Sequence, residues 1–270
     1  MSTVLITGAS SGIGKETAKR FQDKGWNVVA TMRSPEKEEE LAALDNVLVT
    51  RLDVTDPDSI AGAVNDGIER FGSIDVLVNN AGYGAFGPLE SISMDSVRRQ
   101  FDTNVVGLLE TTKAVLPHFR SQQSGAIVNI SSMGGKMTFP LGTLYHGSKF
   151  AVEGLSESLH YEMEPIGVKV KIVEPGMIAT DFGGRSMDFS NDESITEYQG
   201  VVQTAMQGFE SLAANASPPS VVAGVIYTAA TDDTDQLRYT AGEDAKVFMA
   251  NRAAADDATF IGGLKQQLGI

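Results

Sequence analysis

The chain has 270 residues, of which 42% are hydrophobic and 21% are charged, a composition typical of a soluble globular protein with room for one large α/β domain. Thirty-five acidic residues against twenty-one basic ones give a formal net charge of −14, which disfavours non-specific binding to nucleic acid, so an anionic ligand would need a local basic site. Because cysteine is absent, disulfides, thiolate metal ligands and cysteine nucleophiles are excluded.

Signals for targeting and for metal binding are weak. No basic leader with a cleavage site follows Met1, and no apolar run approaches the length of a membrane span. We therefore expect a cytoplasmic protein with no membrane association. His118, His146 and His160 lack the spacing of a metal site, so we expect no metal and assign these histidines to the surface or to packing.

Residues 4–7 are an apolar run typical of a short buried strand, and a glycine-rich loop at 8–14 leads into helix-forming residues at 15–21. This order predicts the first unit of a dinucleotide-binding βαβ fold, in which backbone amides and a helix N-terminus face a pyrophosphate. The spacing Gly-x-x-x-Gly-x-Gly departs from the commoner Gly-x-Gly-x-x-Gly, so a plain tight turn is the alternative. The candidate cofactor contacts in this loop are Gly8, Ser10, Ser11, Gly12, Ile13 and Gly14.

Arg33 stands at the carboxyl end of the second expected strand, at 27–32. NAD sites usually carry an acid here for the ribose 2′-hydroxyl, whereas arginine accommodates the 2′-phosphate of NADP. Acidic residues come too early or lie beyond Pro35, so Arg33, with help from Lys15 or Ser10, predicts NADP as the cofactor. The alternative is that Arg33 is a solvated loop cation.

Two more strands are expected at 47–52 and 74–78, before and after a helix at 58–71. Asp53 follows the first of them and could accept a hydrogen bond from an adenine amine, or cap the next segment instead. The second strand runs into Asn79 and small residues that would let backbone approach a nucleoside, although the asparagines could equally tie the loop to neighbouring strands. The candidate contacts here are Asp53, Val54, Asn80, Ala81 and Gly82.

A long helical segment is expected at 95–119, with Asn104 in its middle. An asparagine inside a helix usually faces solvent or marks a local distortion, but one that faced the sheet could hold a water near Lys149. The fifth strand, at 126–130, is followed by Ser132, at the edge where open α/β sheets place their ligands. A simple turn is the alternative for a serine pair before glycines.

Tyr145 and Lys149 stand four residues apart in a helix expected to end near Pro165, so they lie one turn apart on the same face. A phenol loses its proton at about pH 10, and it becomes a useful acid or base at neutral pH when a fixed cation favours the phenolate. Lys149 could be that cation. An isolated pair of this kind is more often a surface tyrosine and lysine, so the other motifs decide its meaning.

The sixth strand, at 169–173, leads to Pro175, which fixes the backbone, and Gly176, which allows close approach to a ligand. Residues 182–215 then form a long, irregular insert. Its apolar residues either cover the substrate as a lid or belong to a helix that packs on the body. A last strand is expected at 237–240, before a helical tail.

The residues that carry a family resemblance are the loop 7–14, the segment 79–82, Asn104, Ser132, Tyr145, Lys149, Pro175 and Gly176. In order and spacing they resemble the short-chain dehydrogenase/reductase family over nearly the whole chain. The segments 30–33 and 145–159 resemble the branch that contains 17β-hydroxysteroid and retinol dehydrogenases and bacterial ketone reductases.

This resemblance implies that Tyr145 protonates a carbonyl oxygen in reduction, or acts as the base in alcohol oxidation, while a hydride moves to or from the nicotinamide. Ser132 would hydrogen-bond the same oxygen, and Lys149 would bind the nicotinamide ribose and lower the pKa of the tyrosine. Asn104 would seat a water in a proton relay to Lys149. His146 points off the catalytic face by helical spacing and is left out of the mechanism.

The resemblance also implies contacts between the cofactor and the strand ends, with Thr180 facing the carboxamide or, alternatively, capping the next helix. The remaining implied cofactor contacts are Asn104, Tyr145, Lys149, Pro175, Gly176, Ile178 and Thr180. Dimerisation or tetramerisation through the helices at 95–119 and 145–164 is a further implication.

We therefore expect residues 1–270 to form a single doubly wound α/β domain with about seven mainly parallel strands flanked by helices. The expected activity is the NADP-dependent interconversion of a ketone or aldehyde and its alcohol, so the expected partner is a small carbonyl or alcohol substrate. Two alternatives stay open: a catalytically idle NADP-binding regulator, and an NAD-linked alcohol dehydrogenase.

Overall fold

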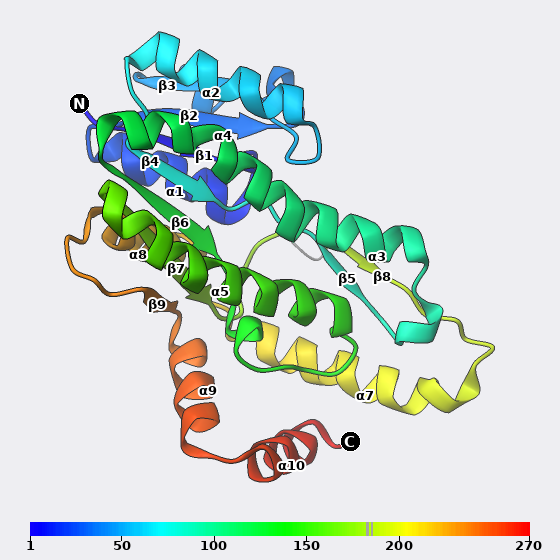
Figure 1. Ribbon diagram of the computed structural model, residues 1–270. Helices are drawn as coiled ribbons and strands as arrows, with labels where there is room; N and C mark the ends of the chain where they lie inside the picture. Colours follow the sequence, from blue (N-terminus) through cyan, green and yellow to red (C-terminus); the bar gives the residue numbers. More distant parts are fainter. Residues whose placement is uncertain (182–183, 185) are drawn as a thin grey trace.

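Seven parallel strands form the central sheet of the computed structural model, which describes residues 1–181, 184 and 186–270 (Figure 1). The chain starts in the middle of the sheet, builds outward to one edge, returns beside its first strand and continues to the other edge. From edge to edge the strands are β3 (Val47–Arg51), β2 (Asn27–Met32), β1 (Thr3–Ile6), β4 (Val76–Asn79), β6 (Gly125–Ile130), β7 (Val168–Pro175) and β9 (Arg238–Ala241). The predicted doubly wound fold of seven strands is confirmed.

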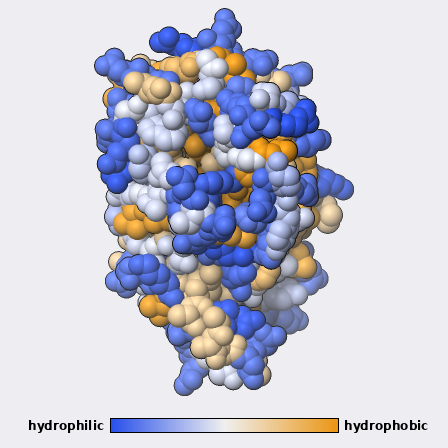
Figure 2. All heavy atoms as spheres, turned by 60° about the vertical axis from the view of Figure 1, so that its left-hand side comes forward, coloured by the Kyte–Doolittle hydropathy of each residue, from blue (hydrophilic) through white to orange (hydrophobic). Residues whose placement is uncertain are grey.

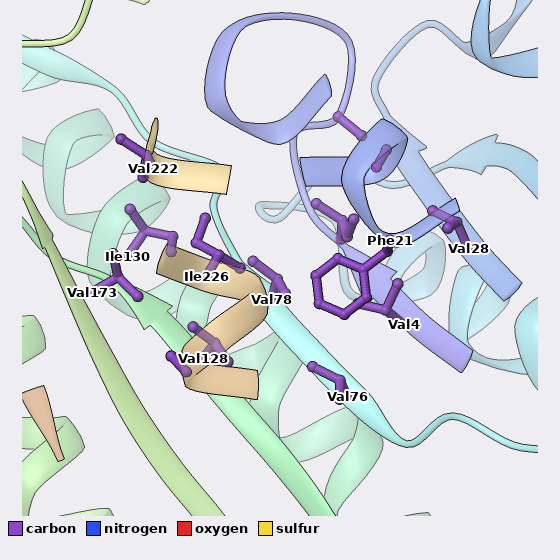
Figure 3. Close-up of a cluster of buried hydrophobic side chains, with 14 of the residues drawn as sticks. Val4, Phe21, Val28, Val76, Val78, Val128, Ile130, Val173, Val222 and Ile226 are labelled. Atoms are coloured by element: carbon purple, nitrogen blue, oxygen red, sulfur yellow. The ribbon is translucent and has the colours of Figure 1, made fainter. Parts of the chain in front are cut away.

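The central strands alternate their side chains between two apolar layers, because successive residues of a strand point to opposite faces. Val4 and Ile6 of β1 belong to one layer and Leu5 to the other. In Figure 3, Phe21 and Ile226 of the helices covering the first layer lie against strand valines. These helices are α1 (Gly12–Asp23) and α8 (Pro219–Thr231).

Three helices cover the opposite face of the sheet and bury the second apolar layer. Ile60, Phe119 and Met163 are their contributions to that layer, and all three side chains are buried. Both faces of the parallel sheet are therefore dry, which explains why its strands read as nearly continuous apolar runs. The helices are α2 (Pro57–Phe71), α4 (Gly107–Gln122) and α5 (Thr143–Met163).

The helical segment expected at 95–119 is two α-helices joined by a π-helical turn. α3 (Met94–Phe101) begins after Ser93, whose side chain accepts the backbone N–H of Ser96 at 3.1 Å. The π turn at Asp102–Val106 then leads into α4. Such turns interrupt the regular helical ladder and often occur at functional sites.

The segment expected as an irregular insert at 182–215 is mostly regular where the structure describes it. β8 (Met187–Phe189) pairs in parallel with β5 (Gly84–Phe86), and α7 (Thr196–Ala213) follows. The expectation of irregularity was wrong because the partner strand of β8 lies about a hundred positions earlier in the chain and becomes its neighbour through the fold. Three positions of this segment, Phe182, Gly183 and Arg185, lie outside the described residues.

The tail forms two helices that extend away from the sheet, and the second contacts α7 (Figure 1). They are α9 (Glu243–Ala254) and α10 (Asp257–Leu268). Short 3₁₀ turns lie at Pro35–Lys37, Leu41–Ala43, Leu89–Ser91, Met133–Gly135 and Glu164–Ile166. No helix in the described part of the chain is long and apolar enough to cross a membrane. Figure 2 shows a face that is mostly hydrophilic, with hydrophobic residues in small separate patches.

Candidate active site

A cavity of about 700 Å³ lies at the carboxyl ends of the strands, where doubly wound sheets bind their ligands. Loops after six of the seven strands contribute to its lining. Apart from Asn104, every predicted site residue lines this cavity: Gly8, Ser10, Ser11, Gly12, Ile13, Gly14, Arg33, Asp53, Val54, Asn80, Ala81, Gly82, Ser132, Tyr145, Lys149, Pro175, Gly176, Ile178 and Thr180. The fold thus gathers residues from positions 8 to 180 at one edge of the sheet.

Asn80 holds the glycine loop after β1 against the loop after β4. Its Nδ2 donates to the carbonyls of Thr7 and Gly8 at 2.9 and 3.1 Å, and its backbone N–H donates to Thr7 Oγ1 at 3.0 Å. At Gly14 a Cβ would lie 2.3 Å from the carbonyl oxygen of Gly8 and 2.5 Å from Asn80 Nδ2, so a side chain cannot fit there. This tight closure brings the N-terminus of α1 to the cleft.

The N-terminus of α1 is arranged as an anion site. Ser11 precedes the helix and makes no side-chain capping bond in the described structure, and the first turn holds no acidic residue. The first backbone amides of a helix lack intrahelical partners, and the helix dipole favours negative charge there. A pyrophosphate therefore fits this loop chemically.

Arg33 and Lys15, the two cations expected near the adenosine ribose, differ in their surroundings. Arg33 is exposed and lines the cleft. The ammonium group of Lys15 is paired with Glu38 at 3.0 Å and with Glu40 at 2.8 Å. Glu38, which lies beyond Pro35 in the sequence, folds back onto α1 and does not line the cleft. Because two carboxylates already balance Lys15, Arg33 is the better candidate for contact with a phosphate.

Asp53 does not cap the helix that follows it. Its Oδ1 accepts hydrogen bonds from the backbone N–H and the hydroxyl of Thr55, at 3.0 and 2.8 Å. Asp56 caps α2 instead, accepting the backbone N–H of Ser59 at 3.3 Å. Asp53 remains at the cleft edge, where the adenine interpretation places it.

Two buried asparagines hold the scaffold around the cleft. The Nδ2 of Asn79 donates to Asn129 Oδ1 at 2.9 Å, which supports the structural interpretation of Asn79. Asn104 lies in the π turn; its Oδ1 accepts the backbone N–H of Tyr83 at 2.8 Å, and its Nδ2 donates to Tyr83 O at 2.8 Å and to Ser148 Oγ at 3.1 Å. Both amide hydrogens of Asn104 are therefore committed to protein groups, and the side chain ties α5 to the loop after β4.

Ser132, Tyr145 and Lys149 meet in the cleft, from the end of β6 and from α5. Ser132 makes a hydrogen bond with Tyr145, and its Oγ accepts the backbone N–H of Gly134 at 3.0 Å. The Nζ of Lys149 lies 5.9 Å from the centre of the Tyr145 ring and donates to the carbonyl of Ile130 at 2.9 Å. The hydroxyl groups of Ser132 and Tyr145 are therefore neighbours, and the buried ammonium group of Lys149 lies near the phenol ring.

Burial has the largest effect on both titratable groups of this trio. It raises the pKa of Tyr145, against the hydrogen bond with Ser132, which lowers it. It also lowers the pKa of Lys149 to about 8, against the charge of Glu153, which raises it. Because burial raises the pKa of Tyr145, the phenol is protonated at neutral pH and is ready to donate. The lowering of this pKa by Lys149 that the resemblance implies stays a prediction.

His146 clamps the loop that follows Ser132, a contact that the sequence analysis missed. Its Nε2 accepts the backbone N–H of Phe139 at 3.0 Å, so its Nδ1 carries the proton and donates to the carbonyl of Gly134 at 2.9 Å. Burial lowers the pKa of His146, which favours this neutral form. At Gly142 a Cβ would lie 2.6 Å from the imidazole, so the glycines around the loop were the signal that a ring packs there.

The far end of the cleft is apolar and aromatic. Phe86 stacks on Tyr145 with 5.2 Å between ring centres and 29° between planes. Met206 and Phe209 of α7 also reach the cleft, and Phe209 packs against the tail helices as well. The second contact supports the interpretation of this segment as a helix that packs on the body, whereas the lid stays a prediction. The apolar lining consists of Phe86, Met133, Phe139, Met177, Met187, Phe189, Met206, Phe209 and Leu212.

Three side chains at the cleft mouth join β8 to the body. The hydroxyl of Tyr83 donates to Asp188 Oδ2 at 2.5 Å, and Arg99 Nη1 lies 3.2 Å from the same oxygen. The guanidinium of Arg99 also sits 4.3 Å from the centre of the Tyr83 ring. Burial and the hydrogen bond to Asp188 raise the pKa of Tyr83 to about 12, so it remains a donor. We call these three residues the β8 latch.

Residues 2–191 match the sequence profile of the short chain dehydrogenases. The chain belongs to this family. An uncharacterized oxidoreductase of Schizosaccharomyces pombe is 47% identical over 239 residues, which cover 88% of this chain and 100% of that protein. The family assignment that the motifs predicted is therefore confirmed, and the protein is an oxidoreductase of the short-chain dehydrogenase/reductase type.

Solved structures agree with this assignment. A short-chain dehydrogenase from Streptomyces avermitilis superposes with a TM-score of 0.85 at 34% identity, covering 99% of this chain and 97% of that one. ElxO, solved with NADP bound, superposes with a TM-score of 0.73 at 30% identity, covering 88% and 97%.

Proposed function

We propose that this short-chain dehydrogenase/reductase uses NADP(H) to interconvert a ketone or aldehyde and the corresponding alcohol, with Tyr145 as the general acid or base. The observation that carries the proposal is the hydrogen-bonded pair of Ser132 and Tyr145 above the buried ammonium of Lys149, in the same cleft as the glycine loop. Two neighbouring hydroxyl groups in one cleft suit the stabilisation of an oxygen on which negative charge develops.

The glycine loop and the exposed Arg33 support NADP as the cofactor. The loop and the N-terminus of α1 would hold the pyrophosphate, because Gly14 lets the helix pack closely against the Gly8 carbonyl and so brings its first amides to the cleft. Arg33 would pair with the 2′-phosphate, and Asp53 would face the adenine. When bound, the nicotinamide supplies or accepts the hydride. The NADP bound to ElxO is consistent with this choice.

In reduction, Tyr145 would transfer its phenolic proton to the carbonyl oxygen while Ser132 hydrogen-bonds the same oxygen. The raised pKa of Tyr145 keeps the proton on the phenol until the oxygen becomes basic. Lys149 would then stabilise the phenolate and hold the ribose hydroxyls. We assign Asn104 a supporting role in the same machinery, because its amide fixes Ser148 one residue before Lys149.

The substrate would be a carbonyl compound with a bulky apolar group. The phenyl ring of Phe86 stacks on Tyr145, and Met206 and Phe209 of α7 close the far side of the cleft. Burying an apolar group against such a wall stabilises binding by about 25 cal/mol per Å² of surface removed from water. The described part of 182–215 would thus serve as a lid over the substrate.

The test is carbonyl reduction by NADPH, followed by absorbance over a panel of apolar aldehydes and ketones. Tyr145→Phe should keep NADPH binding, measured by fluorescence, and lose turnover by more than about a hundredfold. Tyr161→Phe, an exposed tyrosine on the same helix, should behave as the wild type. Negligible reduction of the whole panel by the wild-type protein would favour an NADP-binding regulator, and faster reduction with NADH than with NADPH would favour an NAD-linked dehydrogenase.

A further inference from the structure

A second charged cluster, which we call the rear cluster, lies next to Lys149 on the sheet side of α5. It consists of Glu153 and Glu157 on α5, Glu174 on β7 and Arg238 on β9, three elements that lie side by side in Figure 1. Arg238 Nε lies 2.9 Å from Glu153 Oε2 and 3.8 Å from Glu174 Oε1, and its Nη2 donates to Glu157 Oε2. Among the described residues that line the cleft, none belongs to this cluster.

Glu153 and Glu174 are buried to an extent that is rare for acids, with 4% and 1% of their surface exposed. The Oε1 atom of each has no hydrogen-bond partner among the described residues. Burial and the charge of Glu153 raise the pKa of Glu174 to about 7, so near neutral pH Glu174 is protonated in a large fraction of molecules. Arg238 then mainly balances Glu153 and Glu157, and Glu153 keeps one carboxylate oxygen that no hydrogen bond uses.

The sequence places Glu153 on the catalytic face of α5. It stands four residues after Lys149, as Lys149 stands four residues after Tyr145, so the three follow one another along one face of the helix. Lys149 is 8% exposed, and the hydrogen bond it donates goes to a neutral carbonyl, that of Ile130. A buried ammonium with neutral partners is costly and tends to lose its proton. Glu153 supplies the opposing charge.

We propose that Glu153 is a positioning residue for the reaction: its buried carboxylate, held by Arg238, keeps the ammonium group of Lys149 charged beside Tyr145. The inference rests on the proposed function, in which charged Lys149 supports the phenol. Glu153 does not line the cleft, so it acts through Lys149. A purely structural ion pair between Glu153 and Arg238 would stabilise the fold equally without influencing the protonation of Lys149.

Other charged and titratable groups face this pair from each element packed against it. Glu157 lies on α5, Glu174 on β7 and Arg238 on β9, and Lys136 follows the 3₁₀ turn at Met133–Gly135. Glu174 gains charge as the pH rises through about 7. Glu174→Gln therefore belongs in the experiment, because it removes that second titration and leaves Glu153 in place.

The first experiment is the pH dependence of kcat for carbonyl reduction by NADPH, between pH 6 and 10. Activity should decline as the pH rises through the Lys149 titration. In Glu153→Gln the decline should move to lower pH by about one unit, which is a loss of about fivefold near pH 8 and about tenfold near pH 9, with little loss at pH 6. Glu157→Gln, which removes the exposed partner of Arg238, should keep the wild-type profile.

Glu153→Asp keeps the carboxylate on a side chain that is one methylene group shorter. Its pH profile of kcat should lie between those of Glu153→Gln and the wild type. If Glu174→Gln has the same pH profile of kcat as the wild type, then the decline in activity with rising pH comes from Lys149 and not from Glu174. A loss of activity in Glu153→Gln that is equal at every pH, or a profile that does not move, would overturn the proposal. Circular dichroism of each variant establishes that it folds.

A second measurement does not depend on turnover. Lysine labelled with ¹³C at Cε reports the titration of Lys149 by NMR, and Lys149→Arg assigns its signal. A lower titration midpoint in Glu153→Gln than in the wild type and in Glu157→Gln supports the proposal, even for a protein that reduces no carbonyl. Equal midpoints would overturn it, even for an active reductase. Failure of the proposed function and failure of this inference are thereby distinguished.

Discussion

The backbone N–H of Phe139 donates to Nε2 of His146 at 3.0 Å, and the opposite ring nitrogen of His146 donates to Gly134. The loop from Gly134 to Phe139 lies just after Ser132, whose Oγ accepts the backbone N–H of Gly134. One imidazole on α5 therefore fixes both the loop that follows Ser132 and the backbone of Phe139, whose ring lines the cleft.

His146→Ala should loosen this loop. The variant leaves a buried N–H and a buried carbonyl without partners, which costs about 1–3 kcal/mol for each group. We expect lower kcat/KM for bulky carbonyl substrates and a lower Tm, with partial recovery in His146→Gln, which offers one donor and one acceptor. His160→Ala, farther along α5, is the control. Unchanged kinetics in His146→Ala would show that the loop does not need the clamp.

The clamp should also make stability depend on pH. Burial depresses the pKa of His146, so between that lowered value and the ordinary value of about 6.5 the unfolded chain binds more protons than the folded one. The contribution of His146 is full above pH 6.5 and is lost as the pH falls. Denaturant unfolding from pH 5 to 8 should show a smaller acid loss in His146→Gln than in the wild type; equal losses would assign the acid sensitivity to other groups.

Gly14→Ala should disrupt cofactor binding. The new Cβ would lie 2.3 Å from the Gly8 carbonyl, so the loop must shift, and we expect a loss of about 1–3 kcal/mol in the free energy of unfolding together with weaker NADPH binding. Gly62→Ala is the matched control, since its Cβ would meet nothing within 4 Å on the exposed face of α2. That control should be neutral or more stable by about 0.5–1 kcal/mol. Equal NADPH affinity in Gly14→Ala and Gly62→Ala would contradict the loop geometry.

Arg33→Ala should weaken NADPH binding more than NADH binding. Loss of a charge-assisted contact to the 2′-phosphate corresponds to about a tenfold to hundredfold higher Kd for NADPH. Arg51→Ala removes an exposed arginine that pairs with Asp56 outside the cleft, and it should change neither Kd. Isothermal titration of both cofactors measures the difference. A parallel change in both affinities would assign Arg33 to general electrostatics.

Asp188→Asn should release the β8 latch. Arg99 and Asp188 are about half exposed, so their ion pair alone contributes about 0–1 kcal/mol, and the larger effect should come from the weakened hydrogen bond of Tyr83. We expect a severalfold higher KM for bulky substrates and faster proteolysis near 186–190. Asp233→Asn, which removes an exposed partner of Lys169, is the control. Proteolysis at the wild-type rate would indicate that β5 alone holds β8.

The order of elements and most of the cleft were predictable because their signals are local. The glycine loop stands between a strand and a helix, and the four-residue spacing of Tyr145 and Lys149 places them on one helical face without knowledge of any other element. Strand ends converge at one edge of a parallel sheet, so residues that follow strands were expected to meet there.

Tertiary structure decided what lies between elements that are distant in the chain. The ion pair of Arg238 with Glu153 spans 85 positions, the hydrogen bond of Tyr83 to Asp188 spans 105, and neither has a local pattern. The same reason applies to the pairing of β8 with β5 and to the ring of His146, whose partners depend on how a loop folds over α5. Sequence periodicity determined which face of its helix or strand each residue occupies. Packing determined which groups lie against that face, and therefore the protonation of the titratable residues on it.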